Sequence, residues 1–95
     1  MQHCVYILYS ASIDKFYVGE TEDLMSRIQM HNLGTFTGAY TKRATDWTLI
    51  FNIDCESRLQ ARKIERHIKA MKSRAYYQSL VSYPELSQKL LNKFQ

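Results

Sequence analysis

The chain has 95 residues, of which 45% are hydrophobic and 13% aromatic, and its formal net charge is +4. This composition excludes a disordered chain, which would have fewer aromatic residues and more net charge, and the length allows one hydrophobic core. No apolar run approaches the roughly 18 residues of a membrane-spanning helix, and the first residues lack a signal-peptide pattern. We therefore expect a cytoplasmic protein that has no contact with a membrane.

Two strand-like segments, His3–Ser10 and Lys15–Gly19, predict an antiparallel hairpin at the start of the chain. Side chains alternate along a strand, so Tyr6 and Tyr17 each have a defined face. If the hairpin turns about the junction of Ala11 and Ser12, Tyr6 lies directly opposite Tyr17. The two phenols would then be neighbours on one face of the sheet.

A first helix is predicted from about Glu22 to His31 or Asn32, with Thr21 as its N-cap. Its apolar stripe is expected to consist of Leu24, Met25 and Ile28. Arg27 and His31 are four residues apart, so they project from one face of this helix.

The second half of the chain predicts one more strand and three more helices. Residues 34–45 have the composition of a loop, and Trp47–Ile53 is apolar enough for a strand in the centre of a sheet. Ser57 and Gln60 form a capping box before apolar positions at helical spacing, namely Ala61, Ile64, Ile68 and Met71. A short helix is expected from Ser73 to Val81, and Pro84 opens a last one. The fold class is therefore α+β, with a small three-stranded antiparallel or mixed sheet flanked by helices in the order β-β-α-β-α-α.

Basic residues are concentrated between Arg58 and Arg74. This segment holds four arginines and three lysines against one acid, Glu65. Such a stripe favours a polyanionic partner, of which nucleic acid is the commonest, although a solvated helix face is the alternative. The two cysteines, Cys4 and Cys55, are far apart and outside any metal-binding spacing, so we expect both to be small buried apolar residues.

Several motifs occur together in one order. Cys4-Val5-Tyr6 is followed by Tyr17-Val18-Gly19, and Arg27 is followed by the run from His31 to Gly34. Tyr40-Thr41 lies in the loop, and Ala61, Glu65 and Lys69 are spaced four residues apart. In this the chain resembles the GIY-YIG nuclease superfamily, and most closely its small stand-alone bacterial members. These are related to the catalytic domain of the nucleotide-excision repair incision subunit and to GIY-YIG homing endonucleases. Cys4 and Val5 replace the glycine and isoleucine of the first motif, which are backbone and packing residues there.

The resemblance implies a GIY-YIG nuclease domain over residues 1–80, with 81–95 as a helical extension packed on it. It also implies hydrolysis of phosphodiester bonds in DNA with one divalent metal ion, Mg²⁺ or Mn²⁺. The implied catalytic residues are Tyr6, Tyr17, Arg27, His31 and Glu65.

The implied roles differ from residue to residue. Tyr6 would accept the proton of the attacking water, directly or after giving its own proton to His31. Nearby cations, Arg27 above all, would have to lower the pKa of that phenol, and Arg27 would also stabilise charge on the phosphate. Tyr17 would position the water or the phosphate. Glu65 would bind the metal ion, which stabilises the leaving oxygen.

Phosphate contacts are expected from five cations, Lys42, Arg43, Lys69, Lys72 and Arg74. The substrate is expected to be DNA, or RNA, with selectivity for substrate structure and a link to DNA repair or recombination. Specificity would come from this small surface, a homodimer or a protein partner. Two alternatives stay open, a catalytically weak nucleic-acid-binding module of the same fold and a protein-interaction domain. Taken singly, each tyrosine could serve packing alone, and Glu65 could merely pair with Lys69.

Overall fold

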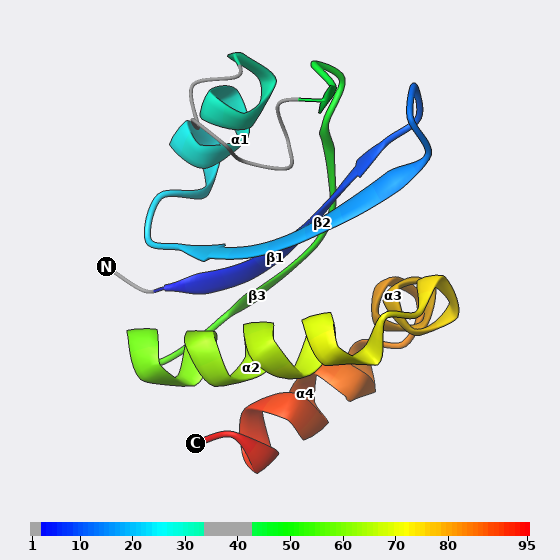
Figure 1. The fold of residues 1–95 in the computed structure, drawn as a ribbon. Coiled ribbons are helices and arrows are strands. Elements are labelled where there is room, and N and C mark those ends of the chain that lie inside the picture. Colours follow the sequence, from blue (N-terminus) through cyan, green and yellow to red (C-terminus); the bar gives the residue numbers. More distant parts are fainter. Residues whose placement is uncertain (1–2, 34–42) are drawn as a thin grey trace.

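The computed structural model describes residues 3–33 and 43–95. Three antiparallel strands form one sheet in the order β2-β1-β3, with β1 at Cys4–Ser10, β2 at Lys15–Thr21 and β3 at Thr48–Asp54. Helices cover both faces of this sheet (Figure 1). The α+β class and the order of elements are as the sequence predicted.

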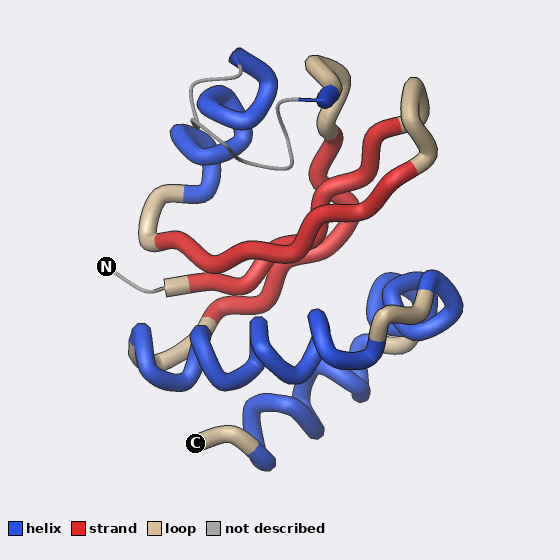
Figure 2. The backbone as a smooth tube through the Cα atoms, in the orientation of Figure 1, coloured by secondary structure: helices blue, strands red, loops and turns tan. Residues whose placement is uncertain are grey.

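The helices are divided between the two sides of the sheet (Figures 1 and 2). Helix α1 (Leu24–Leu33) covers the first face, and α2 (Arg58–Met71), α3 (Arg74–Ser82) and α4 (Pro84–Lys93) cover the second. Each face has its own core. The buried residues of the first are Tyr6, Leu8, Ala44 and Trp47, and those of the second include Val5, Ile7, Val18, Ile53, Ile64, Ile68, Leu80 and Leu90.

The register of the hairpin differs from the prediction. Tyr6 pairs with Gly19, and Tyr17 pairs with Leu8, so the expected direct opposition of the two tyrosines is wrong. The turn is centred one residue later than expected, and Asp14 adopts a positive φ of 52° at its end. Because the pairing moves by two residues, both phenols keep the same face of the sheet, as diagonal neighbours.

The central strand is β1, and the prediction that the third strand is central is wrong. Nearly every residue of β1 is buried, since α1 covers one of its faces and α2 the other. In β3, exposed residues such as Asn52 and Asp54 alternate with the buried Phe51 and Ile53, and the pairing with β1 shifts between Ile7 and Leu8. That alternation is typical of an edge strand with one covered face.

Helix α1 begins two residues later than predicted because β2 extends to Thr21. Asp23 is its N-cap: the Asp23 Oδ1 accepts a hydrogen bond from the Ser26 backbone N–H at 3.2 Å. The expected cap, Thr21, instead accepts from the Asp23 N–H at 3.1 Å. Met25 is 69% exposed and does not belong to the apolar stripe.

Helix α2 begins at the predicted cap. The Ser57 hydroxyl accepts from the Gln60 N–H at 3.1 Å, and the Gln60 carboxamide accepts from the Glu56 N–H at 2.7 Å. The same carboxamide donates to the Leu91 carbonyl at 3.2 Å, which joins α2 to α4. Met71 is 43% exposed, so the apolar stripe of α2 ends at Ile68.

Two further expectations concern the cysteines and the membrane. Cys4 and Cys55 are buried as free thiols. Within residues 3–33 and 43–95, none of the helices has the length and apolar character needed to cross a membrane.

Candidate active site

A buried tyrosine and a buried histidine form the centre of the candidate site. The Tyr6 hydroxyl, from β1, lies 2.8 Å from the Nε2 of His31, which comes from the last turn of α1. Both residues are 1% exposed. Burial, helped by the charge of Arg27, lowers the pKa of His31 to about 4, so the ring is neutral at pH 7. In the tautomer protonated at Nδ1, the Nε2 of His31 accepts a hydrogen bond from the Tyr6 hydroxyl.

The second tyrosine lies against this pair. The Tyr17 ring centroid is 4.8 Å from that of His31 and 6.3 Å from that of Tyr6. Gly19, which pairs with Tyr6, makes this packing possible: a Cβ on Gly19 would lie 2.5 Å from the Tyr6 hydroxyl oxygen. The glycine is therefore needed for close approach of the Tyr6 ring to the strand.

Arg27 acts on both buried groups through its charge. It lies one turn before His31 on α1, and its guanidinium opposes the protonation of His31 and lowers the pKa of Tyr6. Even so, the pKa of Tyr6 is raised well above its ordinary value of 10, mainly by burial and then by Tyr17, with a smaller contribution from Glu65. The expectation that nearby cations bring this pKa down is wrong for the protein without substrate, because burial outweighs Arg27.

Glu65 reaches the site from α2. The Lys69 ammonium lies 3.5 Å from the Glu65 carboxylate and 5.9 Å from the centroid of the Tyr17 ring. The side chain of Glu65 is 22% exposed, and its negative charge raises the pKa of Tyr6. The fold therefore places Tyr6, Tyr17 and His31 in contact, with Arg27 and Glu65 near enough for their charges to affect the pKa of Tyr6.

The donor set suits a weakly held, hydrated cation. Among residues 3–33 and 43–95, no three His, Cys, Asp or Glu side chains are arranged as a metal cluster. Of the five candidate catalytic residues, Glu65 is the one with a carboxylate, and its side chain is partly exposed. That fits Mg²⁺ bound through one carboxylate, with water and substrate phosphate completing the shell.

Asn32 is a residue whose role the sequence did not reveal. Its side chain donates to the Trp47 carbonyl at 3.0 Å and accepts from the Trp47 N–H at 2.7 Å. These two bonds tie the end of α1 to the chain entering β3, and Trp47 itself is 2% exposed. Asn32 therefore helps to hold His31 against Tyr6. The signal in the sequence was the position of Asn32, a polar residue directly after a candidate catalytic residue at the end of a helix.

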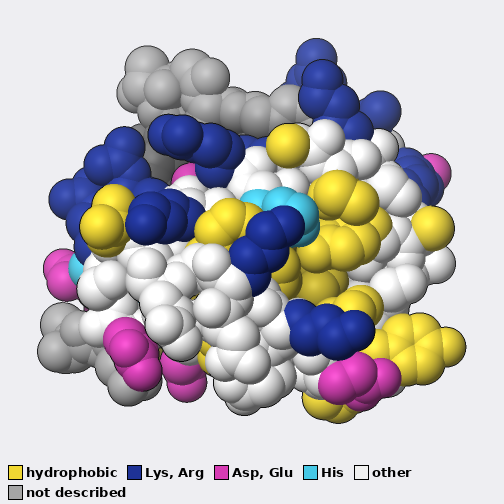
Figure 3. All heavy atoms as spheres, turned by 90° about the horizontal axis from the view of Figure 1, so that it is seen from below, with side chains coloured by type: hydrophobic (Ala, Val, Ile, Leu, Met, Phe, Trp, Pro, Cys, Tyr) yellow, Lys and Arg dark blue, Asp and Glu magenta, His cyan; other side chains and the backbone are white. Residues whose placement is uncertain are grey.

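The residues predicted to contact phosphate differ in exposure and in pairing. Lys42 lies outside the described residues, while Arg43, Lys69 and Lys72 are exposed. Arg74 forms an ion pair with Asp14 at 2.8 Å and also donates to the Asp14 carbonyl. Viewed from the side of α2 and α4, Lys and Arg side chains spread across the surface, with Asp and Glu mostly towards its margins (Figure 3).

Comparison with known proteins identifies the family. A family model described as the GIY-YIG catalytic domain matches residues 2–78. The chain belongs to the GIY-YIG family. Its fold also resembles the solution NMR structure of the UPF0213 protein BH0048 from Bacillus halodurans, with 34% sequence identity and a TM-score of 0.52. The similarity covers 86% of this chain and 84% of that one. Among curated proteins, none matches.

The family match confirms the resemblance seen in the motifs. GIY-YIG domains are nuclease domains that act on nucleic acid, generally with a divalent metal ion. Of the motif residues, Tyr6, Tyr17 and His31 lie together at the candidate site, whereas Val5, Val18 and Ala61 are buried in the core on the other face of the sheet. Gly34, Tyr40 and Thr41 lie outside the described residues.

Proposed function

We propose that this protein is a metal-dependent endonuclease that hydrolyses phosphodiester bonds in DNA, with selectivity for substrate structure and a role in DNA repair or recombination. The observation that carries the proposal is the 2.8 Å hydrogen bond between the Tyr6 hydroxyl and a neutral His31, beside Tyr17, Arg27 and Glu65. A packing tyrosine needs no such neighbours.

Tyr6 and His31 together form the proposed proton acceptor. A phenol with a raised pKa is a weak acid, so we do not expect it to be ionised before the reaction. Tyr6 instead takes the proton of the attacking water as it passes its own proton to the Nε2 of His31. The short hydrogen bond already in place aligns this transfer.

Arg27 and Tyr17 are proposed to handle the phosphate. Arg27 projects from the same face of α1 as His31, so its guanidinium can bind the equatorial phosphate oxygens and stabilise their charge in the transition state. Tyr17, which is half-buried and lies over His31, can donate a hydrogen bond to the water or the phosphate. Exposed Arg43, Lys69 and Lys72, together with Lys42, would bind flanking phosphates.

Glu65 is proposed to hold one Mg²⁺ or Mn²⁺ ion. A bound divalent ion supplies charge stabilisation for the leaving 3′ oxygen. Lys69, which pairs with Glu65, also lies 5.9 Å from the centroid of the Tyr17 ring.

The proposal is tested by cleavage of labelled single-stranded, duplex, flapped and branched DNA, with matching RNA substrates, in Mg²⁺ or Mn²⁺ and in EDTA. We expect nicking that EDTA abolishes, and a loss of at least about 100-fold in Glu65→Gln. Glu85→Gln, an exposed acid in the first turn of α4, is the matched control and should cleave as the parent does.

Two results would contradict the proposal. One is the absence of cleavage of every substrate by concentrated protein with either metal. The other is equal activity of Glu65→Gln, which would point to a contaminating nuclease. Salt-dependent binding of nucleic acid without cleavage would instead support the alternative, a binding module of the same fold.

A further inference from the structure

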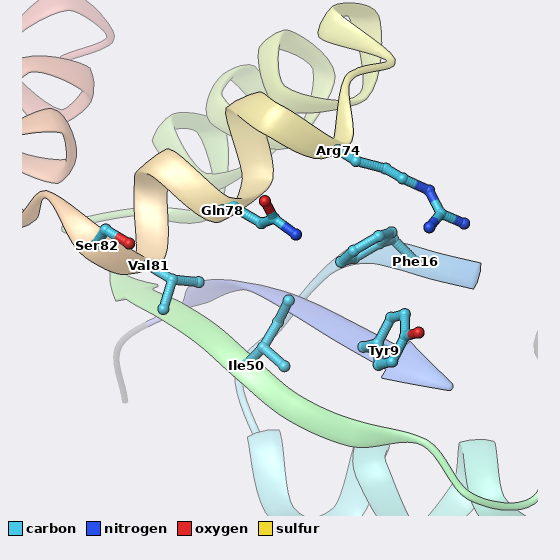
Figure 4. Close-up of a pocket in the computed structure, with 7 residues that line it drawn as sticks. All are labelled: Tyr9, Phe16, Ile50, Arg74, Gln78, Val81 and Ser82. Carbon is cyan, nitrogen blue, oxygen red and sulfur yellow. The ribbon is translucent and has the colours of Figure 1, made fainter. Parts of the chain in front are cut away.

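A pocket separate from the candidate active site lies between α3 and the sheet, on the face opposite α1 (Figure 4). Its volume is about 560 Å³, within the range of small-molecule sites. The lining residues come from all three strands and from α3, and they are Tyr9, Phe16, Ile50, Arg74, Gln78, Val81 and Ser82. None of the five candidate catalytic residues is among them.

The floor of this pocket is aromatic and its rim is polar. The Tyr9 and Phe16 rings lie 4.9 Å apart between centroids, and the Arg74 guanidinium lies 5.3 Å from the Phe16 centroid. The Tyr9 hydroxyl donates to Asp14 at 2.7 Å, which fixes the orientation of that ring. Gln78 adds a carboxamide that can both donate and accept hydrogen bonds. The Tyr9 and Phe16 rings are tilted to each other by 48°, Phe16 also packs against Tyr77, and Arg74 is paired with Asp14. Aromatic surface with an amide beside it suits a planar heterocycle.

The pocket and the candidate site lie on opposite faces of the same edge strand, so the heterocycle that we consider is a base of the nucleic-acid substrate. Phe16 and Tyr17 are consecutive residues of the edge strand β2, so one faces the pocket and the other faces the site. A cation lies near each ring, Lys69 near Tyr17 and Arg74 near Phe16. Each cation is also paired with a carboxylate, Lys69 with Glu65 and Arg74 with Asp14. The edge of β2 therefore carries two cation–aromatic pairs in succession. Proteins bind single-stranded nucleic acid with such groups, because aromatic rings stack on bases and cations contact phosphates.

We propose that the pocket binds an unpaired nucleobase of the nucleic-acid substrate, at a position removed from the bond that is cut. The inference rests on the proposed function for the identity of the substrate. A base in a duplex is stacked on both sides and cannot enter, so the pocket selects substrates with a single-stranded segment around the edge of β2. This selection supplies a physical cause for structure selectivity in so small a protein.

The test measures binding of a fluorescently labelled single-stranded oligonucleotide in EDTA, where no cleavage occurs. A set of oligonucleotides, each with one abasic position, identifies the base that enters the pocket. For the parent protein we expect one position at which base removal weakens binding about tenfold. Val81→Trp, which fills the pocket from an exposed site on α3, should bind the intact strand about tenfold more weakly and show no abasic effect.

Ala75→Trp is the matched control, because Ala75 is exposed on the same helix and does not line the pocket. It should retain both the affinity and the abasic effect of the parent. An abasic effect that persists in Val81→Trp, or its absence in the parent, would overturn the proposal. So would oligonucleotide-induced shifts of backbone NMR signals confined to the surroundings of Arg27 and Glu65, with the signals of Ile50 and Gln78 unmoved.

The two proposals fail in different ways. Shifts around Arg27 and Glu65 together with metal-dependent cleavage, but none in the pocket, would remove the nucleobase pocket and leave the nuclease. Shifts and an abasic effect at the pocket, with no cleavage under any condition, would support the pocket and remove the nuclease.

Discussion

Gly19→Ala tests whether the Tyr6 ring needs a glycine beneath it. The added Cβ would lie 2.5 Å from the Tyr6 hydroxyl oxygen, 2.7 Å from Cζ and 3.0 Å from Cε2 of Tyr17. Tyr6 is 1% exposed and its hydroxyl is bonded to His31, so the ring has little room to move away. Gly19 does not have a positive φ, so the substitution is judged by this contact alone.

Two effects of opposite sign decide the outcome. An alanine inside a strand normally gains about 0.5–1 kcal/mol over glycine, because it loses less backbone entropy on folding. Overpacking of a core costs about 1–3 kcal/mol, and loss of the Tyr6–His31 hydrogen bond adds about 1 kcal/mol. The net expectation is destabilisation by about 2 kcal/mol, which corresponds to a fall in Tm of roughly 8–16 °C for a domain of this size.

Urea unfolding and a thermal scan measure the stability, and nuclease activity is measured beside them at a temperature where the variant is folded. The same substitution in a Tyr6→Leu background is the control, because the shorter side chain removes the contact. There Gly19→Ala should be neutral or stabilising. A Gly19→Ala single variant that is as stable as the parent, or more stable, would refute the packing argument.

Three further outcomes follow from the site. The pKa of His31 falls from 6.5 to about 4 on folding. The free energy of unfolding should therefore decrease by about 3 kcal/mol as the pH drops from 6.5 to 4. His31→Gln should lack this decrease when urea midpoints are compared across that range. Asn32→Ala should cost about 1–3 kcal/mol and change the fluorescence of Trp47, the single tryptophan; unchanged fluorescence and stability would show that the two Asn32–Trp47 hydrogen bonds do not hold the end of α1 in place. Lys69→Ala should reduce the salt dependence of DNA affinity by about one phosphate contact, whereas Lys63→Ala, exposed on the same helix, should not.

The order of the elements could be predicted because apolar periodicity and capping residues are local signals. The five candidate site residues came from the resemblance to the GIY-YIG family. The register of the hairpin could not be predicted. Asp14, at the end of the turn, is held by Arg74 from sixty residues further along the chain. No pattern within residues 3–21 contains that contact, so the centre of the turn was misplaced by one residue.

Other differences have the same non-local origin. β1 and β3 are similarly apolar, and β1 is central because it pairs with β2 along one edge and with β3, which comes much later in the chain, along the other. Thr21 and Asp23 are both good capping residues, and the length of β2 decides between them. The pKa of Tyr6 likewise depends on burial, which residue types and spacing do not reveal.

Arg27 connects these electrostatic features to the proposed chemistry. Burial of the pair, together with the charge of Arg27, lowers the pKa of His31 and keeps it unprotonated, while burial raises the pKa of Tyr6, which keeps its proton. A phosphodiester bound at Arg27 would offset the guanidinium charge, so that charge would lower the pKa of His31 less. Substrate binding would then raise the proton affinity of His31 at the moment when Tyr6 has a proton to pass on. A bound, uncleaved phosphorothioate strand should therefore raise the pKa of His31 in an NMR titration, and an unchanged pKa would show that Arg27 does not couple the phosphate to the Tyr6–His31 pair.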